Sequence, residues 1–415
     1  MRHTLMTILA AVLATVAPAS AAQPEAPKPL PPKVVGAWKN AGALVGWMSA
    51  GEYGAPAFRD AIVAGGGKPG DLPAFQFRFV WRGVAGLPQP EQPFALYLHS
   101  TDISDKGLKE LAGLKNLQGL DLGVTKVTDA GMKELAALKG LRWLKLPATQ
   151  ITDAGLKGVS ACKSLETLNL AATQVSDTGL KELGELKDLQ RLDLLFTRVT
   201  DAGMKELAQV KSLQALNLAS TGITDKGLTE LTGLKRLQAL GLGSAKVTDG
   251  GLKTLARMQE LRTLNLSDLP LTDAGLKDLS PLKGLQTLDL SFTRVTDAGL
   301  KDLAGLEALV SLDLHGAKVT GPGVKELAGL KHLERLDLGN GPLTDAGLKE
   351  ASRLKTLKWL GVNSTQITDA GLKEVIGMKN LEVLFMPGTK NVTKAGVDEL
   401  QKAMRELRIV HEALN

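Results

Sequence analysis

Residues 117–140 read LQGLDLGVTKVTDAGMKELAALKG, and close copies of this stretch follow one another along the chain. Its frame is L-x-x-L-x-L-x-x-T-x-[VI]-T-D-x-G-[LM]-K-x-L-x-x-L-K-x. A fixed period of this length is the signature of a solenoid built from stacked repeats. One glycine of the frame recurs every 24 residues, and after 25 in the last copy, at positions 107, 131, 155, 179, 203, 227, 251, 275, 299, 323, 347, 371 and 396.

Each unit combines a strand period with a helix period. Leu120 and Leu122 alternate with outward-facing residues, as in a strand with one buried face. Between Met132 and Leu138 an apolar residue stands at every third position, which forms one stripe of a helix. One unit cannot bury both faces alone, so stacked units must enclose a continuous core between a strand wall and a helix wall.

The pair Thr128-Asp129 stands directly before this helix. Side-chain oxygens at such a position accept the unpaired N–H groups of the first helical turn. We predict that Asp129 provides this N-cap. Val127 is expected to make a further inward contact between strand and helix.

Over roughly residues 93–405 the frame resembles the leucine-rich repeat family, and [VI]-T-D-x-G-L resembles its cysteine-containing, F-box-type subclass. The resemblance implies an α/β solenoid, with a parallel sheet on the concave face and helices on the convex face. Threonine replaces the subclass's cysteine or asparagine in most units, and we expect its hydroxyl to bond the turn backbone. The units that depart from this rule carry Ala245, Leu269, Ala317 and Gly341.

The ends of the chain differ from the repeats. Residues 1–21 contain the apolar run LMTILAAVLATV and the small-x-small sequence at 19–21, which is typical of a signal peptide. Residues 22–33 read as a proline-rich linker. Residues 34–92 are rich in aromatics, with a strand pattern at 75–81, and are predicted to cap the repeats of residues 93–396. Residues 397–415 break the period and are predicted to form a C-terminal cap.

Composition argues against several classes of function. The net charge of +6 on 415 residues includes no run of five basic residues, so nucleic-acid binding is not indicated. Cys162 is the one cysteine and replaces a core leucine, and the five histidines are scattered. Neither a metal site nor a catalytic set is visible, so we expect no cofactor and no enzymatic activity.

The repeat brings equivalent positions into columns. The outward position between the two strand leucines is expected to form an acidic and polar ladder, and the position two residues earlier carries tryptophan and arginine. Two exposed phenylalanines each begin an identical FTRVTDAG stretch. The predicted partner-binding residues are Asp121, Asp193, Asp289, Asp313, Asp337, Trp143, Trp359, Arg191, Arg335, Phe196 and Phe292.

Each of these features has a second interpretation. Asp and Asn also keep an exposed sheet soluble, and duplication of a repeat block also explains two identical stretches. The lysine columns of the helices are interpreted as solvated surface, paired locally with acids such as Glu110, Glu134 and Glu182.

The sequence therefore predicts an exported protein-binding module, secreted or periplasmic, which uses its concave face and has no membrane insertion after signal cleavage. The F-box resemblance implies an alternative, a substrate-recognition subunit of a ubiquitin ligase, although residues 34–92 do not show an F-box. Ligand binding by residues 34–92 is a third hypothesis. The identity of the partner stays open.

Signal cleavage after Ala21 predicts a mature chain that begins at Ala22, with cleavage after Ala22 as the next choice. Mass spectrometry of the exported protein should show this terminus. Ala21→Arg should leave the precursor uncleaved, because the site requires a small residue. A chain that still begins at Met1 in the exported fraction would contradict the prediction.

Overall fold

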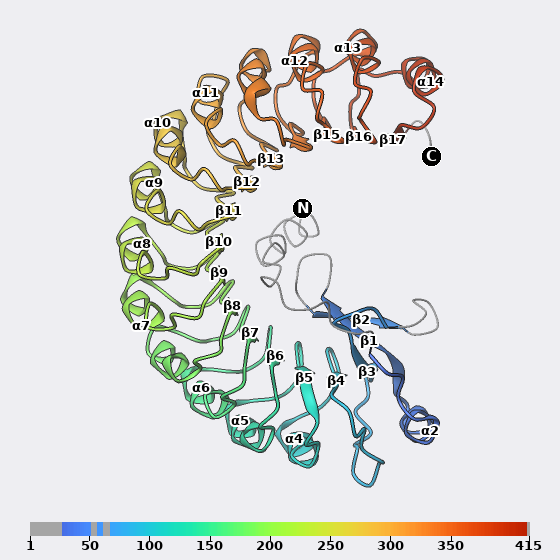
Figure 1. Cartoon of the computed structure of the whole chain (residues 1–415), viewed down its shortest axis with the longest axis vertical. Coiled ribbons are helices and arrows are strands. Elements are labelled where there is room, and N and C mark those ends of the chain that lie inside the picture. Colours follow the sequence, from blue (N-terminus) through green and yellow to red (C-terminus); the bar gives the residue numbers. More distant parts are fainter. Residues whose placement is uncertain (1–26, 51–55, 61–66, 413–415) are drawn as a thin grey trace. The chain divides into compact units, whose positions relative to one another are not determined.

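The computed structural model describes residues 27–50, 56–60 and 67–412. These fall into two compact units. Unit 1 comprises the residues up to 223 together with 233–240, and unit 2 comprises residues 224–232 together with those from 241 onward. In each unit taken by itself, strands line the inner side of an arc and helices line its outer side (Figure 1).

Most strands are short and recur once per repeat. The strands are β1 (Leu44–Ala50), β2 (Pro56–Asp60), β3 (Leu72–Gln76), β4 (Phe94–Tyr97), β5 (Leu117–Asp121), β6 (Trp143–Lys145), β7 (Thr167–Asn169), β8 (Arg191–Asp193), β9 (Ala215–Asn217), β10 (Ala239–Gly241), β11 (Thr263–Asn265), β12 (Thr287–Asp289), β13 (Ser311–Asp313), β14 (Arg335–Asp337), β15 (Trp359–Gly361), β16 (Val383–Phe385) and β17 (Arg408–Val410).

The helices alternate with these strands, and several contain or consist of 3₁₀ turns, labelled η. They are α2 (Pro32–Asn40), α4 (Asp105–Leu111), α5 (Asp129–Met132), η2 (Lys133–Ala137), α6 (Asp153–Val159), η3 (Gly179–Glu185), η4 (Asp201–Gly203), α7 (Met204–Leu207), α8 (Asp225–Leu231), α9 (Asp249–Leu255), α10 (Asp273–Leu276), η5 (Lys277–Leu279), α11 (Leu300–Leu303), η6 (Pro322–Gly329), α12 (Asp345–Ala351), α13 (Asp369–Val375) and α14 (Lys394–Ala403).

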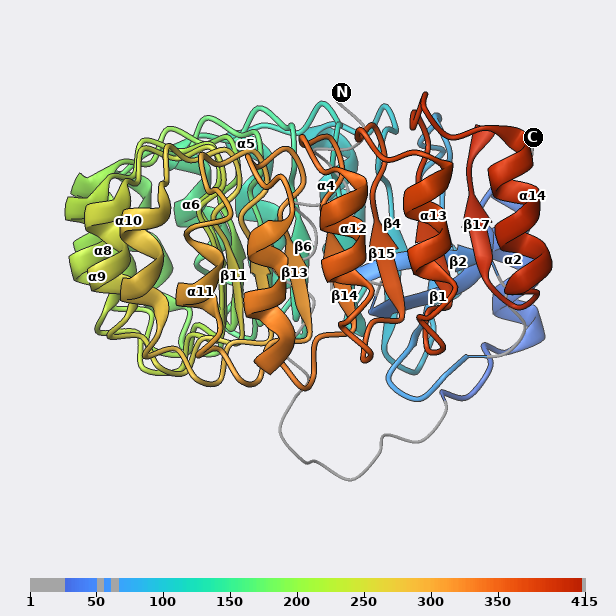
Figure 2. The same ribbon diagram turned by 90° about the horizontal axis from the view of Figure 1, so that it is seen from above.

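The strands pair in parallel and in register from β3 to β9 in unit 1 and from β11 to β17 in unit 2. Equivalent leucines therefore lie side by side: Leu120 pairs with Leu144, and both are fully buried. On the outer side, α12, α13 and α14 stack side by side (Figure 2). The predicted α/β solenoid, with sheet and helices on opposite faces, is confirmed.

The prediction that Asp129 caps its own helix is wrong. Thr128 is the N-cap, and its hydroxyl oxygen accepts the N–H of Ala130 at 3.3 Å. The Asp129 carboxylate instead faces the next repeat, where it accepts the N–H of Thr152 at 2.8 Å and its hydroxyl proton at 2.6 Å. We call this contact the inter-repeat clamp.

The same clamp recurs along both units. Asp153 holds Ser176, and Asp345 holds Thr368, in each case through the backbone N–H and the hydroxyl. Equivalent clamps are Asp105–Thr128, Asp177–Thr200, Asp225–Thr248, Asp249–Thr272, Asp273–Thr296, Asp297–Thr320 and Asp369–Thr393.

The clamp also explains the recurring glycine. A Cβ added at Gly155 would lie 2.4 Å from Oδ1 of Asp129, and one added at Gly275 would lie 2.5 Å from Oδ1 of Asp249. The aspartate of the preceding repeat thus occupies the space in which any other residue would place its side chain. The clamp is interrupted once, where Gly321 replaces the aspartate and Thr344 donates its N–H to the carbonyl of Thr320 at 3.2 Å.

The strands from β3 to β16 each end in a turn with left-handed backbone. Val124 (φ 54°) and Ala148 (φ 52°) hold this conformation, and their N–H groups donate to Pro147 and Ala171 of the next repeat at 2.8 and 2.9 Å. The following threonine bonds the turn as expected, since the hydroxyl of Thr125 donates to the carbonyl of Leu122 at 2.6 Å. Where Ala245 replaces threonine, its own N–H donates to Leu242 at 3.0 Å.

Residues 34–92 add an antiparallel extension to the sheet. Strand β1 pairs antiparallel with β2 and with β3, and β3 pairs in parallel with β4, the first strand of the repeats. Trp38 of α2 is fully buried and stacks on Phe75 with ring centroids 4.0 Å apart. The sheet extension thus meets the end of the repeat core, as a cap does.

Several boundaries differ from the predictions. The strand expected at 75–81 ends at Gln76: Phe77 is still buried, but the backbone turns at Phe79 (φ 63°), which is 76% exposed. Helix α2 begins at Pro32, inside the expected linker, because proline is well suited to the first turn of a helix. At the other end α14 and β17 continue the solenoid pattern. The predicted signal peptide lies outside the described residues.

The clamp predicts that Gly179→Ala destabilises unit 1. The new Cβ would lie 2.6 Å from Oδ1 of Asp153, and such overpacking costs about 1–3 kcal/mol. Gly184→Ala is the matched control in the same 3₁₀ helix, because nothing lies within 4 Å of its Cβ position. Urea denaturation should show a lower midpoint for the first variant only. Equal midpoints would contradict the steric explanation of the glycine.

Candidate functional site on the strand face

The outward column between the strand leucines is mostly buried, which corrects the expectation of an exposed acidic ladder. Asp121, Asp193, Asp289 and Asp337 are all less than a tenth exposed, and Asp313 is half-buried. Each accepts the backbone N–H two residues further on, at 2.9 or 3.0 Å. These carboxylates therefore hold the strand-end turn in place.

Asparagine performs the same task in other repeats and links the column sideways. Asn169 and Asn217 accept the N–H groups of Ala171 and Ala219. Their amide groups donate to the two oxygens of Asp193 at 3.0 and 3.1 Å. The side chains of this column thus hydrogen-bond to one another and to the backbone of the turns.

Burial raises the pKa of these carboxyl groups. Desolvation raises the pKa of Asp193 to about 6, although its hydrogen bonds and the charge of Lys145 act in the opposite direction. Desolvation, followed by the charges of Asp337 and Asp289, raises the pKa of Asp313 to about 8. The strand face of unit 2 is thus less negative near neutral pH than three fully ionised aspartates would make it.

His315 lies against this acidic column and was not among the predicted site residues. Its Nδ1 is 3.5 Å from Oδ1 of Asp337. Burial acts to lower the pKa of His315, but the hydrogen bond and charge of Asp337 and the charges of Asp313 and Asp289 raise it overall. The sequence gives only a weak indication that His315 belongs to a site, because His99 is the only other histidine in the same column.

The two tryptophans of the strand face have different environments. Trp143 is half-buried in unit 1 and packs on a cluster of Met48, Ala74 and Ala95. Phe58 and Tyr97 pack on the same cluster. Because β1 and β3 contribute to this cluster, Trp143 helps to seat the N-terminal sheet extension.

Trp359 is half-buried in unit 2 and makes different contacts. The guanidinium carbon of Arg335 lies 3.4 Å from the centroid of its ring. Phe385, which the sequence analysis did not single out, stacks on the indole of Trp359, with ring centroids 6.1 Å apart and an interplanar angle of 20°. Arg335 is exposed, whereas Arg191, in the same column of unit 1, is half-buried.

Phe196 and Phe292 lie at the left-handed turn positions, with φ of 54° and 57°. Their side chains are 63% and 43% exposed, and Phe292 contacts His315 edge-on with ring centroids 5.2 Å apart. Left-handed backbone is unfavourable for bulky residues. Most other repeats place a smaller residue there, such as Ser220 or Ala172.

The repeat frame, its register and its turn geometry coincide with one known family. A family profile described as Leucine Rich repeat matches residues 161–184, 211–231, 285–304 and 329–350. These four stretches match leucine-rich repeats, and the chain has the solenoid fold of such repeats.

Two solved structures of this kind are similar to the chain. An internalin from Listeria monocytogenes has 24% identity and a TM-score of 0.55, over 70% of this chain and 79% of the internalin. A leucine-rich-repeat protein of Leptospira interrogans has 24% identity and a TM-score of 0.49, over 76% of this chain and 89% of its own. No curated protein matches the chain.

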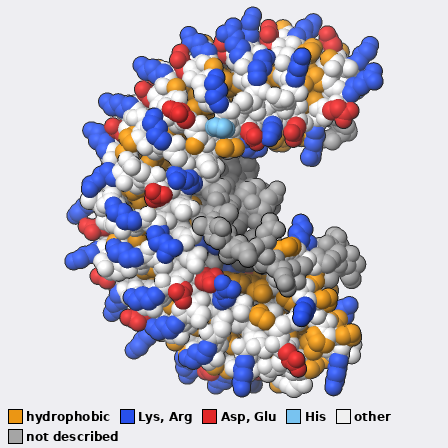
Figure 3. Space-filling model, in the orientation of Figure 1, with side chains coloured by type: hydrophobic (Ala, Val, Ile, Leu, Met, Phe, Trp, Pro, Cys, Tyr) orange, Lys and Arg blue, Asp and Glu red, His pale blue; other side chains and the backbone are white. Residues whose placement is uncertain are grey.

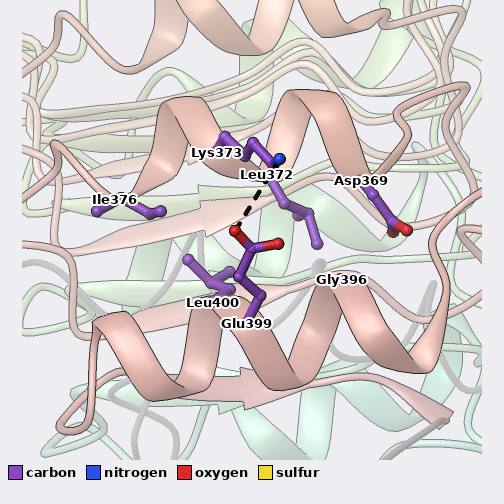
Figure 4. Close-up of a pocket in the computed structure, with 7 residues that line it drawn as sticks. All are labelled: Asp369, Leu372, Lys373, Ile376, Gly396, Glu399 and Leu400. Carbon is purple, nitrogen blue, oxygen red and sulfur yellow. Dashed lines mark ion pairs between the residues drawn. The ribbon is translucent and has the colours of Figure 1, made fainter.

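Other parts of the chain give less support for a functional site. Cys162 is buried, donates to the carbonyl of Leu135, and burial raises the pKa of its thiol to about 11, as befits a core residue. Among the described residues no group of His, Cys, Asp and Glu is arranged to hold a metal ion. A shallow hollow between α13 and α14 contains the Lys373–Glu399 ion pair at 4.0 Å (Figure 4). It is an ordinary seam between stacked helices.

The helix side carries many of the lysines and arginines, which line its outer rim (Figure 3). Some pair between repeats, as Lys349 does with Glu374 at 4.0 Å. Glu110, expected to pair with a lysine, instead accepts the N–H of Val84 at 3.0 Å. Exposed pairs of this kind contribute little to stability.

The raised pKa of Asp313 predicts a pH-dependent effect of Asp313→Asn. Because the folded chain binds this proton more tightly than the unfolded chain, the wild type loses stability as pH rises from about 4 through 8, by at most about 1.4 kcal/mol per pH unit. Asparagine retains the oxygen that accepts the N–H of His315 and does not titrate. The advantage of the variant should therefore grow with pH and level off above pH 8 in urea denaturation.

Asp297→Asn is the control of opposite sign. Burial acts to raise the pKa of Asp297, but hydrogen bonds from Thr320, Gly321 and Gly323 lower it overall. Its contribution to stability is present above the unfolded pKa and is lost as pH falls through the folded value. Parallel pH profiles for the two variants would contradict both assignments.

Proposed function

We propose that this leucine-rich-repeat protein is an exported, non-enzymatic interaction protein that binds a protein partner through its strand face. Leucine-rich-repeat proteins generally mediate protein–protein interactions. Export rests on the pattern of residues 1–21. In the part of the chain that the structure describes, no helix has the length and apolar character needed to cross a membrane.

One observation carries the choice of face. Phe196 and Phe292 combine an unfavourable backbone conformation with a side chain that stays 63% exposed at Phe196 and 43% exposed at Phe292. Contact with a partner would bury the exposed parts of these rings. Exposed aromatic residues are also the type that dominates interface energetics.

The alternatives receive less support. The described part of residues 34–92 contains the helix α2 and three strands, whereas an F-box requires three helices. The similarity to the F-box-type subclass thus concerns the repeat unit and its Thr-Asp pair, with threonine in place of cysteine. Phe75 and Phe77 of the N-terminal segment are buried against Trp38, which favours capping over ligand binding.

The proposal predicts that Phe196→Asn and Phe292→Asn each weaken partner binding by about tenfold or more, as expected for exposed anchor residues. Neither should lower stability, since Asn340 already occupies the equivalent turn and asparagine tolerates left-handed backbone better than phenylalanine does. A photoreactive phenylalanine analogue at either position should crosslink the partner in the exported fraction. Ile376, 40% exposed on the helix side, is the matched control position. Crosslinks from Ile376 alone would place the interface on the helices and contradict the proposal.

A further inference from the structure

Arg335, Trp359 and Phe385 form a continuous stack on the strand face of unit 2. Arg335 and Trp359 are register partners on the adjacent parallel strands β14 and β15, so the backbone itself places them side by side. Gly361 makes room for the indole, since a Cβ there would lie 2.5 Å from Cη2 of Trp359. We call these three residues the cation–aromatic ridge.

Arg335 has no carboxylate within salt-bridge distance among the described residues. The acids nearest to it in sequence have other partners. Asp337 accepts the N–H of Gly339 at 2.9 Å and lies 3.5 Å from His315. Glu334 pairs with Lys358 at 2.8 Å. The exposed guanidinium therefore has the indole as its neighbour, with its carbon 3.4 Å from the ring centroid.

Such an arrangement suits a carboxylate. A guanidinium presents its N–H donors as a planar fork that matches the two oxygens of a carboxylate, and stacking on an aromatic ring fixes the plane of that fork. An apolar neighbour of the bound acid would meet the exposed parts of Trp359 and Phe385.

We propose that the cation–aromatic ridge of Arg335, Trp359 and Phe385 binds a partner's acidic side chain together with an adjacent apolar residue. This inference rests on the proposed function and names the chemistry of the partner: an Asp- or Glu-containing segment with a large aliphatic or aromatic residue beside the acid.

The surroundings of the ridge are compatible with an anionic partner. Desolvation raises the pKa of Asp289 and of Asp313, so these groups oppose an approaching carboxylate less than fully ionised ones would.

The repeat alone does not produce the ridge, because equivalent residues in unit 1 have other environments. Trp143 occupies the same column in unit 1 but packs on the Met48 cluster. Arg191, also in that column, is half-buried, and burial lowers the pKa of its guanidinium. The exposed stack is thus a local feature of unit 2.

The test measures binding of fluorescently labelled peptides to the mature full-length chain. The probes are short peptides with Glu or Asp beside Phe or Leu, matched peptides with Gln or Asn in place of the acid, and the same peptides with phosphoserine at that position. We expect the carboxylate peptides to bind about tenfold to a hundredfold more tightly than the amide peptides, as one charged bidentate contact would give.

Substitutions locate this preference. Arg335→Gln should abolish it, and Arg335→Lys should retain only part of it, because lysine keeps the charge without the planar fork. Trp359→Ala should weaken all the acidic peptides, whereas Trp359→Phe should preserve their order. Lys358→Gln and Arg353→Gln are controls, because both cations already pair with the chain's own acids and should leave the preference unchanged.

Three results would overturn the inference: no peptide bound by the wild type, an acid preference that survives Arg335→Gln, or phosphoserine peptides bound more tightly than carboxylate ones. If Phe196 and Phe292 crosslink a partner whose binding is unaffected by Arg335→Gln, the inference fails and the proposed function stands. If both positions fail to crosslink while the acidic peptides bind through Arg335, the inference stands and the proposed anchoring role of Phe196 and Phe292 fails.

Discussion

One carboxylate per repeat, facing the next repeat, is the constraint on which the structure depends. In the clamp between Asp129 and Thr152, two hydrogen bonds join the start of one helix to the start of the next. The same carboxylate leaves no room for a side chain at Gly155. Threonine, aspartate and glycine therefore form one interlocking unit, in which each residue type is required by the other two.

The clamp sets the spacing on the helix side, and the turn sets it on the strand side. At the turn, a residue in left-handed conformation donates its N–H to the next repeat, and the threonine after it bonds the carbonyl three residues back. Between the two lies the buried leucine core. Where Gly321 replaces the aspartate, the carboxylate of Asp297 accepts the N–H groups of Gly321 and Gly323 in addition to the bonds from Thr320. Asp297 thus still binds the repeat that contains Gly321, but Gly321 has no carboxylate with which to bind the repeat after it.

The solenoid could be predicted from the sequence because its causes are periodic. Alternating leucines, a helix stripe and a glycine every 24 residues each repeat often enough to be recognised. The periodic pattern does not tell which residue a given side chain contacts. Asp129 next to a helix start fits a cap and fits a clamp equally well, and only the position of the next repeat decides between them. The burial of the aspartate column was missed for the same reason, since a residue that points away from the core still becomes enclosed when its carboxylate turns back to the backbone.

The site residues divide along the same line. Trp143 and Trp359 occupy equivalent positions of the repeat, so the sequence predicts the same environment for both. What distinguishes them comes from outside the frame: the sheet extension supplies Met48 and Ala74 to Trp143, while Arg335 and Phe385 flank Trp359. A solenoid position can hold a small polar residue in one repeat and a large aromatic in the next without a change of fold. Where a large side chain is mostly exposed, as Phe196 is, the repeat frame does not explain its presence. Such residues are therefore the ones proposed to contact a partner.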